Sequence, residues 1–330
     1  MGFLFSKPSY DPRRDIPDLT GKVILVTGAN AGIGLQTSEQ LAIHGAKVYL
    51  ACRTESKAKA AIAGIEDRTP SLKGQSRLMW LPLDLSSMRS SKKAAEEFLS
   101  KEKRLDILIN NAGRLADDYL LSPEGVELSV AVNHLGHFVL TTALLPLLKE
   151  TARRPDADVR IIVVSSSVYA SPGRTTFGTL EDFNDPQSEP GKKNVFSSRF
   201  KRYGTTKFLN VLFTNELQRR LDEEGVPITA ISLHPGGVAT EGAVALDVPW
   251  YFVVFLKLFA KTALEGAYTS LFAATNAQVA AERDKYKGKY IVPVGKIAGP
   301  STEAAKDAGS ARTLWETSEK VVTDITGGSA

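Results

Sequence analysis

Cysteine is almost absent from this sequence, and several common catalytic motifs are missing. Cys52 is the single cysteine, so the chain cannot form an internal disulfide, which favours a reducing compartment such as the cytoplasm. There is no HExxH pair, GxSxG turn or GxxxxGKS/T loop, which argues against a zinc protease, a serine hydrolase and a P-loop phosphotransferase. His134 and His137 lie one helical turn apart without a third ligand nearby in sequence. We therefore expect them on a helix surface or in the core, and we expect no metal site.

The chain also lacks an excess of either charge and any sign of a domain boundary. Its 41 basic and 37 acidic residues are scattered and give a formal net charge of +4, so we expect no nucleic-acid partner. No linker rich in proline, glycine and serine and no internal repeat divides the 330 residues. We therefore predict one domain at 20–300, with an N-terminal extension at 1–19 and a C-terminal helical tail at 301–330.

What the sequence does contain is an alternation of apolar runs and helical stretches. This alternation predicts an α/β fold in which a parallel sheet of about seven strands carries helices on both faces. Because crossovers between parallel strands are right-handed, the carboxyl ends of the strands should share one edge of the sheet. The expected strands lie at 23–27, 47–51, 78–83, 105–109, 160–165, 227–233 and 289–293.

A glycine-rich turn follows the first expected strand, in the segment KVILVTGANAGIG that ends at Gly34. Gly28 would allow the tight turn, Gly32 a close approach of the backbone to a pyrophosphate, and Gly34 the packing of the next helix against the strand. Free N–H groups at the start of that helix would face the phosphates. A turn without a ligand is the alternative. The helical pattern at 33–44 and the second strand complete a βαβ unit, which favours a dinucleotide site in a doubly wound Rossmann fold.

Further motifs follow along the chain: NNAG from Asn110, VNHLGHF around Asn133, VVSS ending at Ser166, YGTTK from Tyr203, and LHPGGV around Pro235. With the TGxxxGxG turn, they resemble the motifs of the short-chain dehydrogenases/reductases. ANAGIG, ACR, VNHLGHF and KFLNVLFTNEL are most similar to the retinol-dehydrogenase-like and fungal carbonyl reductase branch, over residues 20 to about 300. The resemblance implies NADPH-linked reduction of an aldehyde or ketone, and it does not name the substrate.

Tyr203 and Lys207 lie four residues apart in a stretch, 201–221, that predicts an amphipathic helix, so their side chains share a face. A nearby ammonium favours the phenolate and, together with a nicotinamide cation, would lower the pKa of Tyr203 from about 10 towards neutrality, as general acid/base catalysis requires. By spacing alone the pair could be an ordinary exposed contact. The surrounding motifs favour the catalytic interpretation.

Ser166 and Asn133 complete the predicted catalytic set. Ser166 ends the fifth expected strand, where its hydroxyl could hydrogen-bond a substrate carbonyl. Alignment with the family's VSS pattern selects it over its two serine neighbours, and a plain strand-ending serine is the alternative. Asn133 lies inside the helical pattern 123–150, where asparagine is unfavourable. By resemblance it kinks the helix and holds a water that links to Lys207, and the alternative is an ordinary polar residue of the helix interior.

Arg53 stands at the end of the second expected strand, where an acidic residue would favour NAD. Its guanidinium can bind a 2′-phosphate through two hydrogen bonds, so we predict NADP(H), with a solvated surface charge as the alternative. By resemblance, Asp84 contacts the adenine. The whole predicted cofactor site comprises Gly28, Asn30, Gly32, Ile33, Gly34, Arg53, Asp84, Leu85, Asn111, Ala112, Gly113, Tyr203, Lys207, Pro235, Gly236, Val238 and Thr240.

Two segments are expected to form the substrate side. The polar stretch 167–200 is long for the family and is predicted to be a substrate loop. Residues 240–262 are predicted to form a lid that includes the apolar segment PWYFVVFLKLFA. This segment is too short to cross a bilayer, which needs about 20 residues. It could cover an apolar substrate, lie on a membrane surface or pack in the core.

The N-terminus and the apolar segment bear on where the protein lies in the cell. The N-terminal MGFLFS matches the pattern for myristoylation, and packing of Phe3 and Phe5 against the domain is the alternative. One acyl chain gives only marginal membrane binding. We expect a cytoplasmic monomer or homodimer, with contact to a membrane through 250–260 or the N-terminus left open.

The predicted function is hydride transfer from NADPH to the carbonyl of an apolar small-molecule aldehyde or ketone, or the reverse oxidation of an alcohol, with Tyr203 as general acid/base. A dehydrogenase that acts oxidatively, or a biosynthetic tailoring reductase of the same fold, would carry the same four catalytic residues. A non-catalytic NADP(H)-binding regulator would be expected to have lost Tyr203 or Lys207. Both are present.

Overall fold

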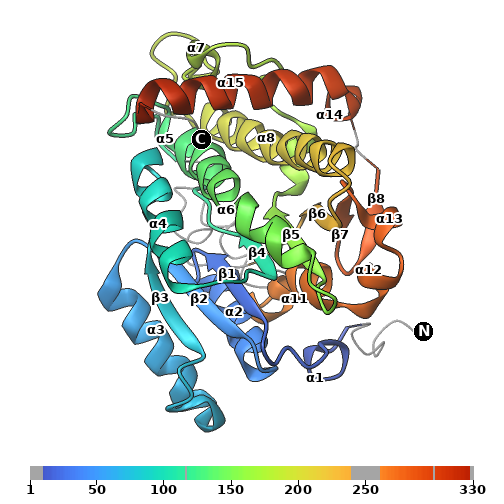
Figure 1. The fold of residues 1–330 in the computed structure, drawn as a ribbon. Coiled ribbons are helices and arrows are strands. Elements are labelled where there is room, and N and C mark those ends of the chain that lie inside the picture. Colours follow the sequence, from blue (N-terminus) through green and yellow to red (C-terminus); the bar gives the residue numbers. More distant parts are fainter. Residues whose placement is uncertain (1–9, 116, 239–260, 300–301, 328–330) are drawn as a thin grey trace, which may run out of the picture.

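The computed structural model describes residues 10–115, 117–238, 261–299 and 302–327, which form one eight-stranded sheet covered by helices (Figure 1). The strand order is β3-β2-β1-β4-β5-β6-β7-β8. β1 to β7 are parallel, and β8 pairs antiparallel with β7. The predicted fold class is confirmed, although β8 was not expected. The strands are β1 (Val23–Thr27), β2 (Lys47–Cys52), β3 (Leu78–Pro82), β4 (Ile107–Asn110), β5 (Val159–Val164), β6 (Ile228–Leu233), β7 (Tyr290–Val292) and β8 (Lys296–Ala298).

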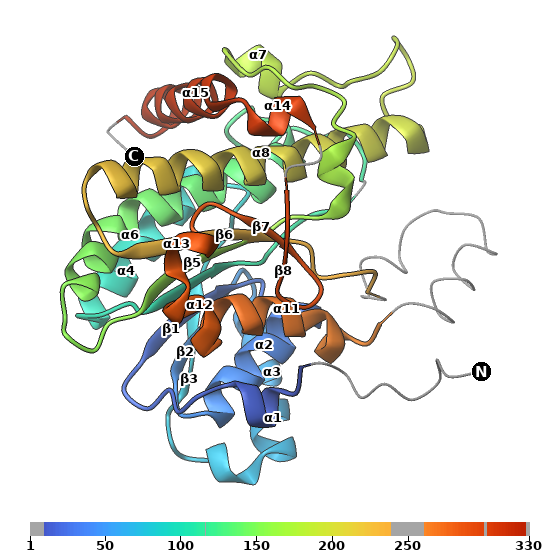
Figure 2. The ribbon, with the colours of Figure 1, turned by 90° about the vertical axis from the view of Figure 1, so that its right-hand side faces the viewer.

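Helices cover both faces of the sheet, and β1 shows why. All five of its residues are buried, and successive side chains enter opposite layers of the core: Leu25 packs in one, Ile24 and Val26 in the other. The Leu25 layer lies under α4 (Met88–Lys101), α6 (Gly136–Ala152) and α8 (Phe196–Glu223), with α15 (Ala308–Thr326) outside α8 (Figure 2). The opposite layer lies under α1 (Pro12–Asp15), α2 (Gly32–Ile43), α3 (Glu55–Arg68) and α11 (Ala263–Thr275).

The helix that was expected at 123–150 is a composite. It consists of α5 (Leu128–Val130), a π-helical segment η2 (Ala131–Leu135) and α6. The π segment contains Asn133, and such segments occur frequently at functional sites. The composite helix is long and apolar enough to cross a membrane by length and composition, but most of it is buried inside the protein.

The loop 167–200 and the C-terminal residues pack on the same side of the sheet. The loop contains η3 (Ser167–Ala170) and α7 (Leu180–Phe183), and Phe183 stacks on Phe177 with both rings buried. In α15, Trp315 stacks on Phe213 of α8. The division of the chain into extension, domain and tail remains a prediction. The remaining short helices are η1 (Pro70–Leu72), α12 (Ala277–Ala281), α13 (Arg283–Tyr286) and α14 (Glu303–Lys306).

Candidate active site

A cleft lies at the carboxyl edge of the sheet, where the strand order reverses between β1 and β4. Ligands bind at this position in open α/β sheets. The cleft consists of two adjoining hollows of about 460 and 640 Å³, and both are lined by Gly28, Ala112, Arg114 and Val132. One hollow ends at Arg53 and the other at Tyr203. The structure therefore brings the predicted cofactor residues and the predicted catalytic tyrosine into one groove.

The glycine-rich turn forms the floor of the groove. Gly28 has a φ of +65°, and a Cβ atom there would lie 2.9 Å from the Cβ of Ala112. At Gly34 a Cβ would lie 2.5 Å from both the Gly28 oxygen and the Asn111 Nδ2, so any side chain would separate helix α2 from the turn. The N-cap residue of α2, Ala31, makes no side-chain cap, and the first turn has no acidic residue. Its amide N–H groups therefore remain available to a phosphate.

The far end of the groove carries positive charge. Arg53 is exposed directly after β2, and Lys57 lines the same hollow from the start of α3. Neither forms an ion pair with any residue that the structure describes. Asp84 lies in this hollow too, and its carboxylate accepts hydrogen bonds from the Ser86 N–H and hydroxyl, at 3.0 and 2.7 Å. Lys57 was not predicted from the sequence, although its place near the start of the helix after Arg53 indicates that it could face the same hollow.

The opposite end is lined by Tyr203 and Lys207, and Ser166 lies beside Tyr203. The Lys207 Nζ lies 5.7 Å from the centre of the Tyr203 ring and donates a hydrogen bond to the Val164 carbonyl at 2.9 Å. Burial lowers the pKa of Lys207 to about 8. Burial raises the pKa of Tyr203 to about 12, and a hydrogen bond with Ser166 partly opposes that increase. Ser165 also lines this hollow, but its hydroxyl is engaged in a hydrogen bond that it donates to the Lys207 carbonyl oxygen at 2.8 Å.

The pKa of Tyr203 thus differs from the expected one in direction. The helical spacing placed an ammonium beside the phenol as predicted, but spacing carries no information about burial. Burial destabilises the phenolate more than the hydrogen bond from Ser166 stabilises it, so the Tyr203 hydroxyl keeps its proton at neutral pH.

Asn133 lies behind these residues and connects two elements. Its Oδ1 accepts a hydrogen bond from the Arg114 N–H at 2.7 Å, and its Nδ2 donates to the Arg114 carbonyl and the Thr206 hydroxyl, both at 2.9 Å. A Cβ on Gly113 would lie 3.3 Å from both the Asn133 Oδ1 and the Lys207 Nζ. The side chain therefore joins the loop after β4 to α8. The water link to Lys207 that the family resemblance implies remains a prediction.

Most other predicted residues also lie at the groove, and some fall outside the described structure. Ile33 and Pro235 line the hollow at Tyr203, while Asn30 and Leu85 line the hollow at Arg53. Gly236 and Val238 follow β6 close to Pro235. Thr240, the apolar segment 249–260 and the N-terminal MGFLFS lie outside the described residues.

Two buried polar atoms beside the site were not anticipated. The His234 Nδ1, just after β6, and the Tyr290 hydroxyl, on the neighbouring β7, have no hydrogen-bond partner among the described residues. The Tyr290 ring packs against Tyr169, which follows Ser166, with ring centres 4.5 Å apart. The sequence contains no local signal for Tyr290, because its burial depends on the pairing of β6 with β7.

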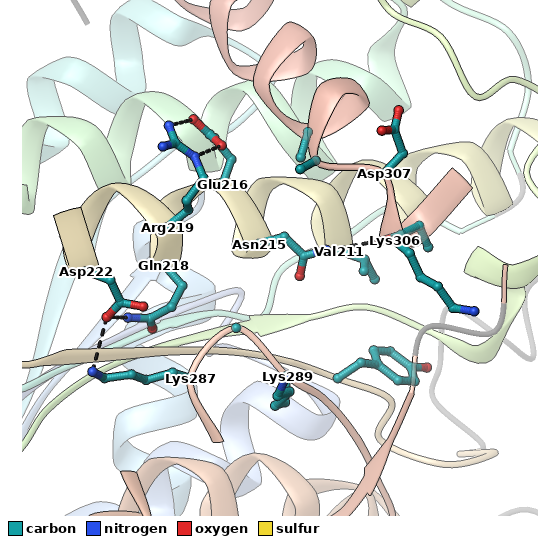
Figure 3. Close-up of a pocket in the computed structure, with 15 residues that line it drawn as sticks. Val211, Asn215, Glu216, Gln218, Arg219, Asp222, Lys287, Lys289, Lys306 and Asp307 are labelled. Atoms are coloured by element: carbon teal, nitrogen blue, oxygen red, sulfur yellow. Dashed lines mark hydrogen bonds and ion pairs between the residues drawn. The ribbon is translucent and has the colours of Figure 1, made fainter. Parts of the chain in front are cut away.

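A separate hollow lies beside α8, between the loop before β7 and the start of α15 (Figure 3). Its charged side chains largely pair with one another, as in Arg219–Glu216 at 2.7 Å and Lys287–Asp222 at 3.1 Å. It contains none of the predicted site residues. The groove at the carboxyl edge is therefore the candidate active site.

Residues 22–177 match the family model of the short chain dehydrogenases. A short chain dehydrogenase/reductase of Colletotrichum higginsianum is 46% identical over 323 residues, which cover 96% of this chain and 80% of that protein. Human retinol dehydrogenase 14 is 36% identical over 319 residues, which cover 92% of this chain and 86% of the relative.

Solved structures share the fold at lower identity. A 3-ketoacyl-(acyl-carrier-protein) reductase from Brucella melitensis, complexed with NADH, superposes with a TM-score of 0.61 at 23% identity, covering 86% of this chain and 100% of that one. A short chain dehydrogenase from Shigella flexneri, complexed with NADP, gives a TM-score of 0.59 at 23% identity, covering 83% and 98%. The glycine-rich turn, the open start of α2 and the groove above them are what a nicotinamide dinucleotide requires. The identity to the Colletotrichum and human proteins over more than 90% of this chain shows that the chain belongs to the short-chain dehydrogenase/reductase family of oxidoreductases.

Proposed function

We propose that the protein is an NADPH-dependent reductase that transfers a hydride to the carbonyl carbon of an aldehyde or ketone, and that catalyses the reverse oxidation of the alcohol. One observation carries this proposal. A single groove runs from Arg53 and Lys57, which form no ion pair within the described residues, to Tyr203, which has Ser166 beside it and Lys207 close to its ring.

The groove fits NADP(H) in two respects. The uncapped start of α2 offers N–H groups to the diphosphate, and the close packing of Gly28 and Gly34 lets the backbone approach it. Arg53 and Lys57 supply positive charge for a 2′-phosphate. When bound, the reduced dinucleotide supplies the hydride.

The residues of the chain then manage the proton and the developing charge. Tyr203, with a pKa of about 12, is protonated at neutral pH and donates its proton to the carbonyl oxygen. Ser166 donates a hydrogen bond to the same oxygen and holds the carbonyl in place. Lys207 is charged below a pH of about 8 and stabilises the tyrosinate that remains.

The substrate is proposed to be apolar. The aromatic segment 249–260 in the predicted lid supports this, as does the similarity to a retinol dehydrogenase, because retinol is an apolar alcohol. The lone Cys52, which is buried, supports a cytoplasmic location.

Consumption of NADPH, followed by absorbance, tests the proposal against a panel of aliphatic, aromatic and retinoid or terpenoid aldehydes and ketones. Turnover should be highest with bulky apolar carbonyls. Tyr203→Phe should reduce kcat by a factor of ~100 or more while the Kd of NADPH stays within about twofold.

Tyr169→Phe is a matched control on a neighbouring ring and should keep most of the activity. A Tyr203→Phe enzyme with most of the wild-type rate would contradict the assignment of the proton donor. Tight NADPH binding without turnover in either direction would favour a regulator, and turnover only with alcohols and NADP⁺ would favour an oxidative dehydrogenase.

A further inference from the structure

His137 occupies a central position behind the groove. It lies in the first turn of α6, directly after the π segment, and is 3% exposed. Its Nε2 is 2.8 Å from the Thr27 hydroxyl at the end of β1, and its Nδ1 is 3.3 Å from the carbonyl oxygen of Asn133. One imidazole ring therefore spans the distance from the glycine-rich turn to the predicted catalytic asparagine.

The bonding partners of Thr27 determine which nitrogen of His137 carries the proton. The Thr27 oxygen accepts the N–H groups of Asn111 and Ala112, both at 2.9 Å, so its own proton must be donated elsewhere. The His137 Nε2 at 2.8 Å is a better acceptor than the Ile109 carbonyl at 3.4 Å. The Nε2 is therefore unprotonated, and the Nδ1–H donates to Asn133.

The ring stays neutral throughout the working range of pH. Burial lowers the pKa of His137 to about 3, and Lys207 is a further positive charge that disfavours the imidazolium. A neutral ring has one donor and one acceptor, and both are used. An imidazolium would carry a second N–H at Nε2, the atom that must accept the hydrogen bond from the Thr27 hydroxyl.

We propose that His137 is a positioning residue for cofactor binding: through Thr27 it fixes the NNAG backbone against the glycine-rich turn, and through the Asn133 carbonyl it fixes the π segment. This inference rests on the proposed function only for the identity of the cofactor. The geometry has a local consequence of its own, because His137 orients the Thr27 oxygen that accepts the Ala112 N–H and shares the Asn111 N–H with the Ile109 carbonyl, which lies 3.0 Å from that nitrogen.

His134 provides a matched comparison within the same helix. It is 2% exposed, and burial lowers its pKa to about 3 as well. Its Nε2 bonds to the Ser318 hydroxyl of α15 at 2.9 Å, and its ring packs near Phe138 and Phe213. The two histidines thus have equal burial and charge, but His134 has no contact with the groove.

The experiment compares His137→Phe and His134→Phe by hydrogen exchange of the free protein and by NADPH titration. His137→Phe should speed hydrogen exchange in peptides covering 107–115 and raise the Kd of NADPH by ~tenfold or more, as expected when a buried hydrogen-bond network is lost. His134→Phe should speed exchange in peptides covering 311–322 and leave the Kd within about twofold.

A second pair of variants covers the case in which His137→Phe does not fold. His137→Gln offers an amide in place of the ring and should recover part of the affinity, whereas Thr27→Val should reproduce both the faster exchange at 107–115 and the weaker binding. Thr27→Ser should restore both. The inference is overturned if the His137 and Thr27 variants exchange like wild type at 107–115, or if His134→Phe produces the same local effect.

The exchange measurement separates this inference from the proposed function. If wild type does not bind NADPH, the proposed cofactor is wrong, while exchange at 107–115 still decides whether His137 organises this backbone.

Discussion

Replacing Lys207 with methionine should stabilise the free protein at neutral pH while it abolishes catalysis. The Lys207 side chain is 4% exposed, forms no ion pair with a described residue, and donates one hydrogen bond, to Val164. Burial lowers its pKa from 10.5 to about 8. At about 1.36 kcal/mol per pKa unit, holding the charged form in the folded protein costs about 3 kcal/mol at pH 7.

Methionine keeps the length of the side chain and removes the charge. The lost hydrogen bond costs about 1 kcal/mol, and the Val164 carbonyl retains the Asn210 Nδ2 at 3.2 Å as a donor. The net gain in the free energy of unfolding should therefore be about 2 kcal/mol at pH 7.

The gain must depend on pH in a defined direction. In the unfolded chain Lys207 stays charged up to a pH of about 10.5, but in the folded protein only up to about 8. Between these values the unfolded chain binds more protons, so wild-type stability rises with pH through this group. The penalty is complete below a pH of about 8 and disappears towards 10.5. The advantage of Lys207→Met should shrink over the same range.

Urea unfolding measured by circular dichroism and tryptophan fluorescence, at several pH values between about 7 and 10, gives the comparison. Lys101→Met is the control, because this exposed lysine pairs with Glu97 on the surface and its loss should change stability by less than about 0.5 kcal/mol at any pH. A Lys207→Met protein less stable than wild type at pH 7, or an advantage independent of pH, would refute the reasoning.

Two further predictions concern the cofactor end of the groove and the buried Tyr290 on β7. Wild type should favour NADPH over NADH in kcat/KM by about tenfold to a few hundredfold, and Arg53→Asp should narrow or reverse that ratio. Arg153→Asp, at the opposite edge of the sheet, is the control and should leave the ratio unchanged. An unchanged ratio in Arg53→Asp would remove Arg53 from the cofactor site. Tyr290→Phe removes a buried hydroxyl that has no hydrogen-bond partner in the described part of the chain, and it should raise the free energy of unfolding by about 1 kcal/mol. Tyr49→Phe, which breaks a 2.6 Å bond to Glu102, should lower it by a similar amount in the same urea assay, and a destabilised Tyr290→Phe would mean that the Tyr290 hydroxyl has a partner.

The features that could be predicted from the sequence are those fixed by short stretches of chain. A turn with the spacing of Gly28 and Gly34 can be recognised because the positive φ of Gly28 and the close approach of Gly34 to the Gly28 oxygen are local requirements. The pairing of Tyr203 with Lys207 likewise follows from the helical period. β8, with three residues, is too short for any periodicity to show, and it exists because it pairs with β7.

The features that could not be predicted depend on contacts between distant segments. His137 and Thr27 are 110 positions apart, and their bond depends on how the composite helix packs against β1. In sequence His137 was indistinguishable from His134, and both are indeed buried in the core. Which of the two faces the groove is set by the phase of the helix, and that phase includes the π segment at Ala131–Leu135.

Burial acts on Tyr203 and Lys207 in opposite senses, and this explains how one environment can serve both. It raises the pKa of the phenol and lowers that of the ammonium, so each shift disfavours the charged form. Tyr203 therefore stays protonated as the proton donor, while Lys207 retains its charge only up to a pH of about 8. When Tyr203 gives up its proton, the new negative charge arises beside the one buried cation that the catalytic set supplies, and their attraction is strong because water is excluded. The free-energy cost of burying the Lys207 charge in the free protein is thus offset as negative charge develops on Tyr203. This is the trade between stability and activity that is expected of an active site.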